Sequence, residues 1–461
     1  MSLFPNLEQS LLHSWKFFAI EHCADFMPDT EVRKSMALVA QSCLKANISS
    51  GPPEAIFERI QQARVDFAQA LLQRLVEVQA RGAEVFQLLE ITWKALRSRH
   101  LTYEEALIND DTDYFRSLLN VLFLSLQFHL DSPSRSAPEA INKKAEVSSD
   151  LTVIVEVVKT IVAQGFKSLT TYLHDAPEKC APKDFAIIIA ILQTCLQVKN
   201  ADRLYEHIVY HIEEHDTARH ATTLFSWADQ LAVAGDPVYA ELSVSILVKM
   251  STLPMLAEHL AVEAVLMKLS TCRLTNILCQ KKSFGPFDPV SRLYAIWTGG
   301  FLPLCLNMLY SVMRTAPEVA AFLNQFESRL TRASEAFSSH AAVSSVPTSK
   351  WISLSMVSEA YSLALISFIL DRFREAGASA GVDAQAIQDL KWDRVQVKED
   401  IEELLGRRTA LRSRIVATNE KEVEWSRQKP VDPTSGAENR LEEKFVSEMK
   451  AAVTCLGGED S

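Results

Sequence analysis

The chain is poor in glycine, and this scarcity already restricts its fold. Only 13 of its 461 residues are glycine, about 3% where about 7% is usual. Folds rich in strands use glycine for hairpins and bulges, so its scarcity favours helices joined by short polar loops. The hydrophobic share of 48% is ample for a large core and excludes global disorder.

Motifs for catalysis and cofactor binding are also missing. The sequence contains no G-x-S-x-G elbow, no phosphate-cradling glycine loop and no dinucleotide fingerprint, and Gly299-Gly300 stands alone. Its eight cysteines are scattered without a CxxC pair, which predicts free, mostly buried thiols in a reducing compartment. We therefore expect a protein that is not an enzyme and needs no cofactor.

Signals for export, for membrane spans and for nucleic-acid binding are weak or absent. The N-terminus lacks a basic segment followed by a small-residue cleavage site. The stretches 118–130 and 352–370 are the most apolar, but neither is a clean run of about 20 apolar residues, and the second contains Glu359. The net charge of -11 argues against nucleic acid as the main ligand. We expect a soluble protein without direct nucleic-acid contact or membrane insertion.

What the sequence does contain is helical periodicity along most of its length. Apolar residues at spacings of three and four form a clear stripe from Ile56 to Val78. The β-branched run from Val153 to Val162 would permit a strand, but its apolar pairs lie three to four residues apart, which favours a helix. In Arg292–Arg314, two apolar segments meet at Gly299-Gly300. This pair predicts either a corner between two helices or a close approach by another backbone, and we favour the corner.

About eighteen helices paired by short turns predict an all-α fold. No strict repeat survives, so the favoured architecture is a right-handed α-solenoid of degenerate HEAT- or armadillo-like repeats, with a compact all-α enzyme fold as the alternative. We assign 1–388 to the solenoid, with exposed loops near 131–150 and 333–349, and 389–461 to charged capping helices and a tail. Within the latter, Asp389–Trp425 is expected to form one long capping helix, with apolar positions at Val397, Ile401, Leu404, Leu411 and Ile415.

One histidine-rich segment matches a metal-site pattern. His211, Glu214 and His215 satisfy the H-x-x-E-H spacing of inverted zinc peptidases, and His207 lies four residues before His211 on the same helical face. A zinc hydrolase is thus a remote alternative. The simpler interpretation is a solvated polar face, since neither a third distant ligand nor a mixed fold is evident.

Aromatic residues offer a different kind of site. Six of them could line a groove for a partner's amphipathic helix, although at helical spacing each one alone is more typical of a core position. They are Phe322, Phe326, Trp351, Tyr361, Phe368 and Phe373. Such residues dominate interface energetics.

Three segments resemble a known family. They are LYAIWTGGFLPLCLNMLYSVM at 293–313, KWISLSMVSEAYSLALISFILDRF at 350–373 and DLKWDRVQVKEDIEELLGRRTALRSRI at 389–415. Together they are similar to the C-terminal region of the one-eighty-eight-kilodalton scaffold nucleoporins of the nuclear pore's inner ring, in a fungal form. The resemblance covers about the last two-thirds of the chain and rests on packing motifs.

The resemblance implies a piece of a giant α-solenoid at the nuclear pore complex of the nuclear envelope, shortened relative to the family at its N-terminal side. It implies a structural role, with other nucleoporins as partners and the helical segments of a linker nucleoporin first among them. A karyopherin-like receptor for cargo or phenylalanine-glycine repeats is the alternative in the transport class. The chain itself has a single Phe-Gly dipeptide, Phe284-Gly285, so the resemblance does not make it a repeat-bearing barrier nucleoporin.

Overall fold

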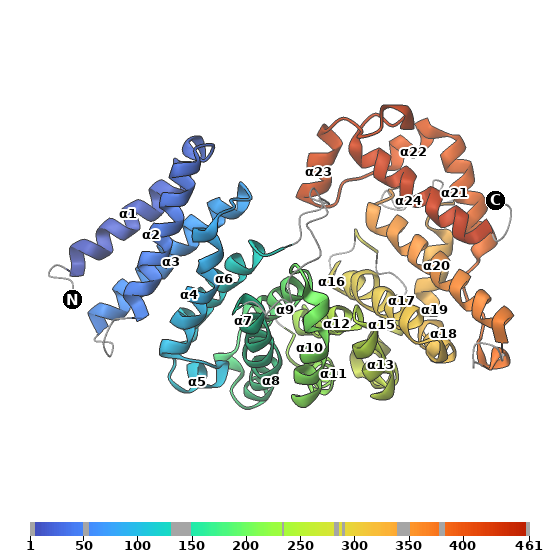
Figure 1. Ribbon diagram of the computed structural model, residues 1–461. Helices are drawn as coiled ribbons and strands as arrows, with labels where there is room; N and C mark the ends of the chain where they lie inside the picture. Colours follow the sequence, from blue (N-terminus) through green and yellow to red (C-terminus); the bar gives the residue numbers. More distant parts are fainter. Residues whose placement is uncertain are drawn as a thin grey trace, which may run out of the picture. The chain divides into compact units, whose positions relative to one another are not determined.

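The structure, a computed structural model, describes residues 5–48, 55–130, 149–232, 235–280, 285–287, 291–338, 351–377 and 383–457 (Figure 1). Within these ranges the regular elements are helices, and strand-like pairing is limited to the isolated bridges Leu130–Val198 and Ile352–Ile415. The predicted all-α solenoid architecture is confirmed. Contacts divide the chain into two compact units, Met1–His220 and Ala221–Ser461, and each is described by itself.

The first unit is a succession of helices, each packed on near neighbours in sequence. Thus α3 packs on α1 and α2, α6 packs on α3 and α4, and α9 packs on α6 and α8, as expected where each hairpin covers the next. The main helices are α1 (Pro5–Glu21), α2 (Thr30–Ile48), α3 (Ala55–Glu77), α4 (Ala83–Arg99), α5 (Tyr103–Ile108), α6 (Thr112–Gln127), α7 (Ser149–Val157), α8 (Gly165–Asp175), α9 (Pro182–Leu196) and α10 (Tyr205–Glu214), while α11 (Thr217–Trp227) runs across the boundary.

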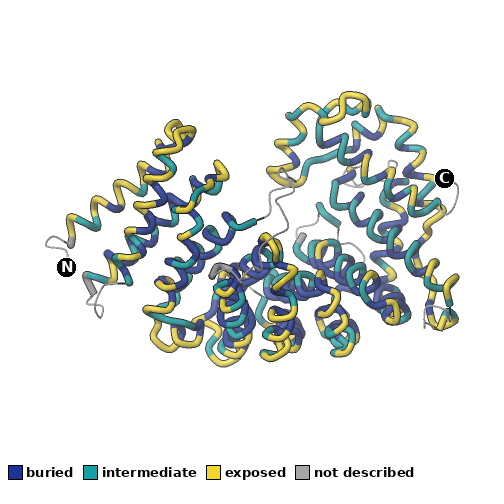
Figure 2. Tube along the Cα trace, in the orientation of Figure 1, coloured by how far each residue is buried: buried dark blue, intermediate teal, exposed yellow. Residues whose placement is uncertain are grey.

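The β-branched run in this unit is helical, as its spacing predicted. The π-helical segment η2 (Val158–Gln164) joins α7 to α8 without a break, because the backbone at both of its ends stays in the right-handed helical region. Its apolar residues are buried. Figure 2 shows the same arrangement throughout each unit, with buried residues on the faces where helices meet.

The second unit continues with shorter helices and ends in a group around one long helix, α20 (Leu354–Ala376), which packs on α17 and α24. The other elements are α12 (Val238–Ser251), α13 (Pro254–Val262), α14 (Val265–Ser270), α15 (Arg273–Gln280), α16 (Ser291–Ala295), η5 (Ile296–Phe301), α17 (Leu302–Ser311), α18 (Ala316–Asn324), α19 (Glu327–Glu335), α21 (Arg394–Gly406), α22 (Arg408–Arg414), α23 (Glu420–Arg427) and α24 (Arg440–Gly457).

The predicted corner at Gly299-Gly300 is wrong. Here α16, the π-helical turn η5 and α17 form one continuous helix, with right-handed backbone at both junctions. Gly300 has a packing role instead. A Cβ added at Gly300 would lie 2.6 Å from the Cγ1 atom of Val244 on α12, whereas one at Gly299 would meet nothing within 4 Å. Gly300 therefore permits the close approach of α12.

The predicted long capping helix at 389–425 is also wrong, because it is three helices. At Arg407 the backbone leaves the helical region, with φ -113° and ψ 66°, and Ile415 is extended. The apolar seam was placed correctly, since Val397, Ile401 and Leu404 are buried on α21 and Leu411 on α22. A new helix then begins at Asn419, whose side chain accepts a hydrogen bond from the Glu422 amide.

The proposed subdivision into 1–388 and 389–461 stays a prediction. In the structure, α21 to α24 are part of the second unit, in which α24 packs on both α20 and α21. Most of the two predicted loops, 131–148 and 339–349, lies outside the described residues. Of the second loop, residues 333–335 still belong to α19.

Two helices, Arg292–Ser311 and Leu354–Ala376, are long and apolar enough by composition to cross a membrane. Their packing gives another reason for that composition. Trp297 and Phe301 of the first helix and Leu363 and Leu370 of the second are at most 1% exposed. The second helix also carries the buried Glu359, which is hydrogen-bonded within the unit. Core helices have this composition when they are covered on most sides.

Candidate partner-binding surfaces

The histidine segment lies on α10, and its spacing does not assemble a ligand set. His211 Nδ1 lies 3.1 Å from Glu214 Oε2, and this contact lowers the pKa of the Glu214 carboxyl. The helix ends at Glu214, so His215 is its C-cap with φ -100° and ψ 10°, and His207 points to solvent as an exposed residue. Among the described residues, no group of three or more His, Cys, Asp or Glu side chains could hold a metal ion.

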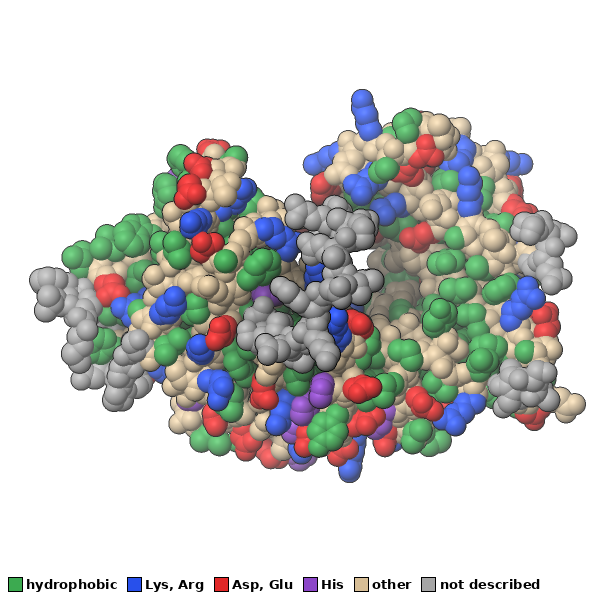
Figure 3. Space-filling model, viewed as in Figure 1, with side chains coloured by type: hydrophobic (Ala, Val, Ile, Leu, Met, Phe, Trp, Pro, Cys, Tyr) green, Lys and Arg blue, Asp and Glu red, His purple; other side chains and the backbone are tan. Residues whose placement is uncertain are grey.

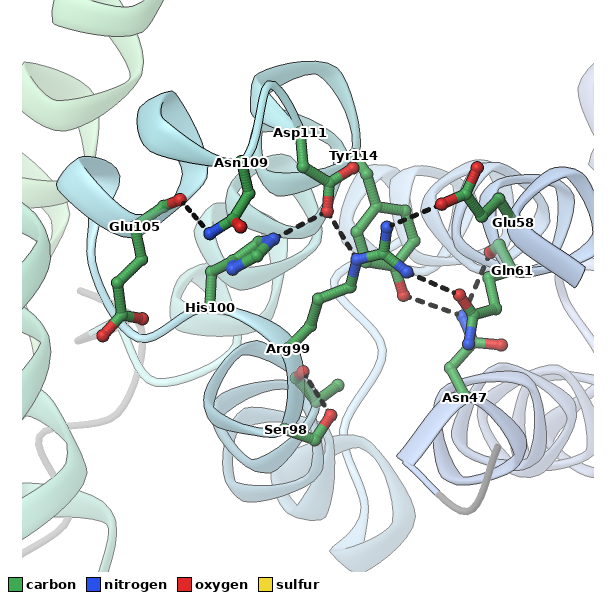
Figure 4. A network of polar contacts seen from close by, with 11 residues as sticks. Asn47, Glu58, Gln61, Ser98, Arg99, His100, Glu105, Asn109, Asp111 and Tyr114 are labelled. Carbon is green, nitrogen blue, oxygen red and sulfur yellow. Dashed lines mark hydrogen bonds and ion pairs between the residues drawn. The ribbon is translucent and has the colours of Figure 1, made fainter. Parts of the chain in front are cut away.

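A half-buried polar network ties together the helices of the first unit (Figure 4). Asp111 accepts from Arg99 Nε at 2.5 Å and lies 2.9 Å from His100 Nε2. Arg99 also donates to Gln61 at 3.0 Å and lies over the Tyr114 ring at 4.9 Å. Burial raises the pKa of Tyr114 to about 12. Each charge has a partner from another helix, so we interpret the network as a structural joint.

A second buried network lies in the core of the second unit. Glu359 of α20 is 1% exposed, and it accepts hydrogen bonds from Tyr294 Oη at 2.8 Å and Trp297 Nε1 at 2.6 Å. Arg332 of α19 donates to both of its carboxylate oxygens at 2.5 Å. Burial, together with the Glu359 charge, raises the pKa of Tyr294 well above its usual range. Three elements are thereby fixed to one carboxylate.

Two of the six predicted groove aromatics belong to the core. Phe322 is 2% exposed and Phe326 is 1% exposed. Their ring centroids lie 5.3 Å apart, and the Phe326 ring lies 5.1 Å from Trp297 and 5.5 Å from Phe301. A partner could reach neither ring in this arrangement, so the groove prediction is corrected for these two residues. The alternative interpretation, a core position, holds for both.

The other four aromatic residues are at least partly accessible. Trp351 is 39% exposed and contacts Phe287, with 5.7 Å between the ring centroids. Tyr361, Phe368 and Phe373 are half-buried on α20. Tyr361 and Phe368 are seven residues apart and thus share one face of the helix, while Phe373 lies on a different face. Only Tyr361 and Phe368 form an aligned pair.

Phe368 lines a cavity of about 520 Å³ between α20, α21 and α24. Its apolar lining includes Val395, which is 64% exposed, and Leu456 near the end of α24. The polar lining comes from the same helices, namely Ser367, Asp371, Arg372, Glu375, Arg394, Lys398, Glu399, Glu402 and Cys455. Protein-binding surfaces also combine apolar with polar side chains, and we call the charged side chains of this lining the rim.

The charges at the rim differ in how far they are already paired. Asp371 is held by Arg374 at 2.7 Å and by Arg394, and Arg372 lies 5.2 Å from the Phe368 ring centroid. In contrast, Lys398, Glu399 and Glu402 form no ion pair with another described residue. The rim therefore offers both signs of charge to a partner.

A large apolar surface on α1 and α2 was missed as a candidate site. Several apolar side chains on α1 are more than 40% exposed, and Figure 2 shows α1 mostly as exposed. The residues on these two helices and the turn between them are Leu7, Leu11, Trp15, Phe17, Phe18, Ile20, Phe26, Leu38 and Val39. A groove of about 500 Å³ runs between Leu11, Trp15 and Val39. Periodicity alone could not show which face lacks a neighbour.

Comparisons with known proteins agree on one family. Residues 88–456 match the family described as the nuclear pore protein NUP188 C-terminal domain. The chain is 34% identical to nucleoporin NUP188 of Chaetomium thermophilum over 97% of its own length and 26% of that protein. It is 23% identical to nucleoporin nup184 of Schizosaccharomyces pombe over 66% of the chain and 19% of that protein. The chain thus spans about a quarter or less of the length of these relatives.

A solved structure extends the likeness to the fold. It contains residues 1445–1827 of Nup188 from Myceliophthora thermophila, and it matches with a TM-score of 0.66 at 31% identity. The match covers 81% of this chain and 98% of that one. Sequence and structure therefore lead to the same relatives.

Proposed function

Because the chain belongs to the family of the nuclear pore protein NUP188 C-terminal domain, we propose that it is a structural scaffold of the nuclear pore complex at the nuclear envelope. It works without catalysis, by holding other nucleoporins in place. The observation that carries this proposal is the match of an all-helical chain over residues 88–456. Stacked helices bury one another and leave extended surfaces, and binding is their usual task.

The partner we propose is a helical segment of a linker nucleoporin, and its site is the cavity at Phe368. An amphipathic helix would place apolar side chains against Phe368, Val395 and Leu456, which all line this cavity. Its charged flanks would meet Lys398 on one side and Glu399 on the other, which are free of ion pairs among the described residues. Tyr361, two turns before Phe368, extends the same face of α20.

Titration of linker-nucleoporin peptides against the chain tests this site. Phe368→Glu replaces an apolar side chain of the cavity lining by a charge, and we expect it to weaken binding by more than about tenfold. Val262→Glu is the matched control, because Val262 is 71% exposed on α13 and does not line the cavity. Equal affinity of wild type and Phe368→Glu for a peptide that binds would remove the cavity from the proposal. Stronger capture by immobilised phenylalanine-glycine repeats than by the linker peptide would favour the receptor alternative.

A further inference from the structure

We propose that Trp425 and three cations around it form a docking site for a short acidic peptide segment of a partner protein. Trp425 lies on α23, and the Lys444 ammonium is 4.6 Å from its ring centroid. The Lys421 ammonium lies at 5.1 Å and the Arg440 guanidinium carbon at 5.8 Å. Two helices, α23 and α24, thus bring three like charges to one indole ring.

Cation–π attraction favours each of these contacts. The three cations nevertheless repel one another, and a carboxylate between them would relieve that repulsion. In the described part of the chain none of the three forms an ion pair. The Arg440 guanidinium donates to the neutral Gln428 side chain, at 2.9 Å. No direct ion pair within the described residues therefore neutralises any of the three cations.

Four carboxylates close to the cluster in sequence have other contacts. Glu422 is 5% exposed and accepts from the backbone and hydroxyl of Thr418. Glu442 is held by Arg412 at 3.0 Å. Glu443 accepts from the backbone amides of Val431 and Asp432 at 2.8 and 2.7 Å, and Glu424 accepts from Gln428 at 2.8 Å. None of these four carboxylates forms an ion pair with Lys421, Arg440 or Lys444, so a carboxylate in direct contact with the three cations would come from a partner.

The surroundings of the cluster favour a peptide. Two further exposed cations, Arg427 and Lys429, follow Trp425 in the sequence, and Figure 3 shows Lys and Arg side chains over the part of the second unit where α23 lies in Figure 1. Val423 and Val431 are 37% and 74% exposed, so apolar side chains of a peptide would also find contacts. Lysine ammonium groups are compact point charges that bind a carboxylate in several orientations.

The net charge of the whole chain argues against a large polyanion as the ligand of this cluster. With a net charge of -11, the protein repels an extended nucleic acid or an anionic membrane over distances where screening is incomplete. A peptide with a few carboxylates is affected mainly by charges within about one Debye length, about 8 Å at physiological ionic strength. The cluster shares no residue with the lining of the Phe368 cavity. A test of this site is therefore independent of a test of the linker site.

Fluorescence anisotropy with a dye-labelled peptide of alternating Glu and Leu tests the proposal on the full chain. We expect the double variant Lys421→Gln/Lys444→Gln to bind at least about tenfold more weakly than wild type. Lys450→Gln is the matched control, since Lys450 is exposed on α24 away from the ring. Trp425→Leu keeps the charges but removes the ring, and it too should weaken binding.

Two results support the proposal further, and three overturn it. A version of the peptide with Gln in place of Glu should not bind. Raising the salt concentration should weaken the binding of the acidic peptide. Equal affinity of wild type and the double variant would refute the site, as would no binding of the acidic peptide to wild type. Tighter binding of a single-stranded oligonucleotide or of phosphatidylserine vesicles than of the peptide would assign the cluster to a different class of partner.

Discussion

Glu359 shows how much can depend on one buried carboxylate. It accepts from Tyr294, Trp297 and Arg332 at 2.5 to 2.8 Å, and its side chain is 1% exposed while that of Arg332 is 19% exposed. Glu359→Gln keeps the shape but leaves the arginine charge without its counter-ion. We expect the free energy of unfolding to fall by about 3 kcal/mol. Urea denaturation measures this change from the unfolding transition of the second unit.

An exposed ion pair provides the control for that substitution. In the pair Arg372–Glu375, at 3.3 Å, the side chains are 46% and 68% exposed. Glu375→Gln should therefore change stability by less than about 1 kcal/mol. A similar loss for both variants would contradict the role given to burial around Glu359.

Buried thiols and phenols make the stability of the chain sensitive to alkaline pH. Burial raises the pKa of Cys195 and of Tyr114 to about 12, whereas the unfolded values are about 8.5 and about 10. Above those unfolded values the native state binds more protons than the unfolded state, so the free energy of unfolding falls as pH rises. Denaturation series should show full stability near pH 8 and a progressive loss from about pH 9 to 12, and a flat profile over that range would contradict the assignment.

At the scale of the element, the two adjacent glycines in η5 make a matched pair. Gly300→Ala would place a methyl group 2.6 Å from Val244, while Gly299→Ala would meet nothing. Alanine is otherwise better than glycine in a helix by about 1 kcal/mol. Thermal unfolding should show Gly299→Ala unchanged or stabilised and Gly300→Ala destabilised by about 1 to 3 kcal/mol. Val244→Ala should rescue the second variant, and equal behaviour of both glycine variants would disprove the close-approach role.

Helix identity could be predicted from the sequence, but the break at Arg407 could not. Apolar spacing placed the seam of α21 and the helical run through Val158 correctly, because burial of one face depends on local periodicity. The break at Arg407 depends on long-range contacts instead. Arg408 and Arg412 reach Glu442 on α24, and Arg414 donates to the carbonyls of Ala336 and Phe337 after α19. Only the pair Arg407–Glu403, at 2.7 Å, follows from sequence spacing.

At the scale of the whole molecule, the all-helical solenoid architecture followed from composition and periodicity, and the family from three quoted segments. The candidate site followed only in part, through Tyr361 and Phe368. Phe322 and Phe368 have the same apolar character in the sequence, yet one lies in an aromatic core and the other at a cavity. Phe322 packs against Phe301 and Phe326, while Phe368 lies where α20, α21 and α24 meet at the cavity. A single sequence does not encode this difference in any local pattern.

Hydrogen exchange of the chain with and without a bound linker-nucleoporin peptide tests the central claim most directly. The account predicts slower amide exchange in the peptide complex across α20 from Ser367 to Glu375, in the first turns of α21 and at the end of α24, since these segments line the cavity. Amides of the first unit should exchange at unchanged rates. Protection confined to α1 and α2, or unchanged exchange in α20 on saturation with a peptide that binds, would contradict it.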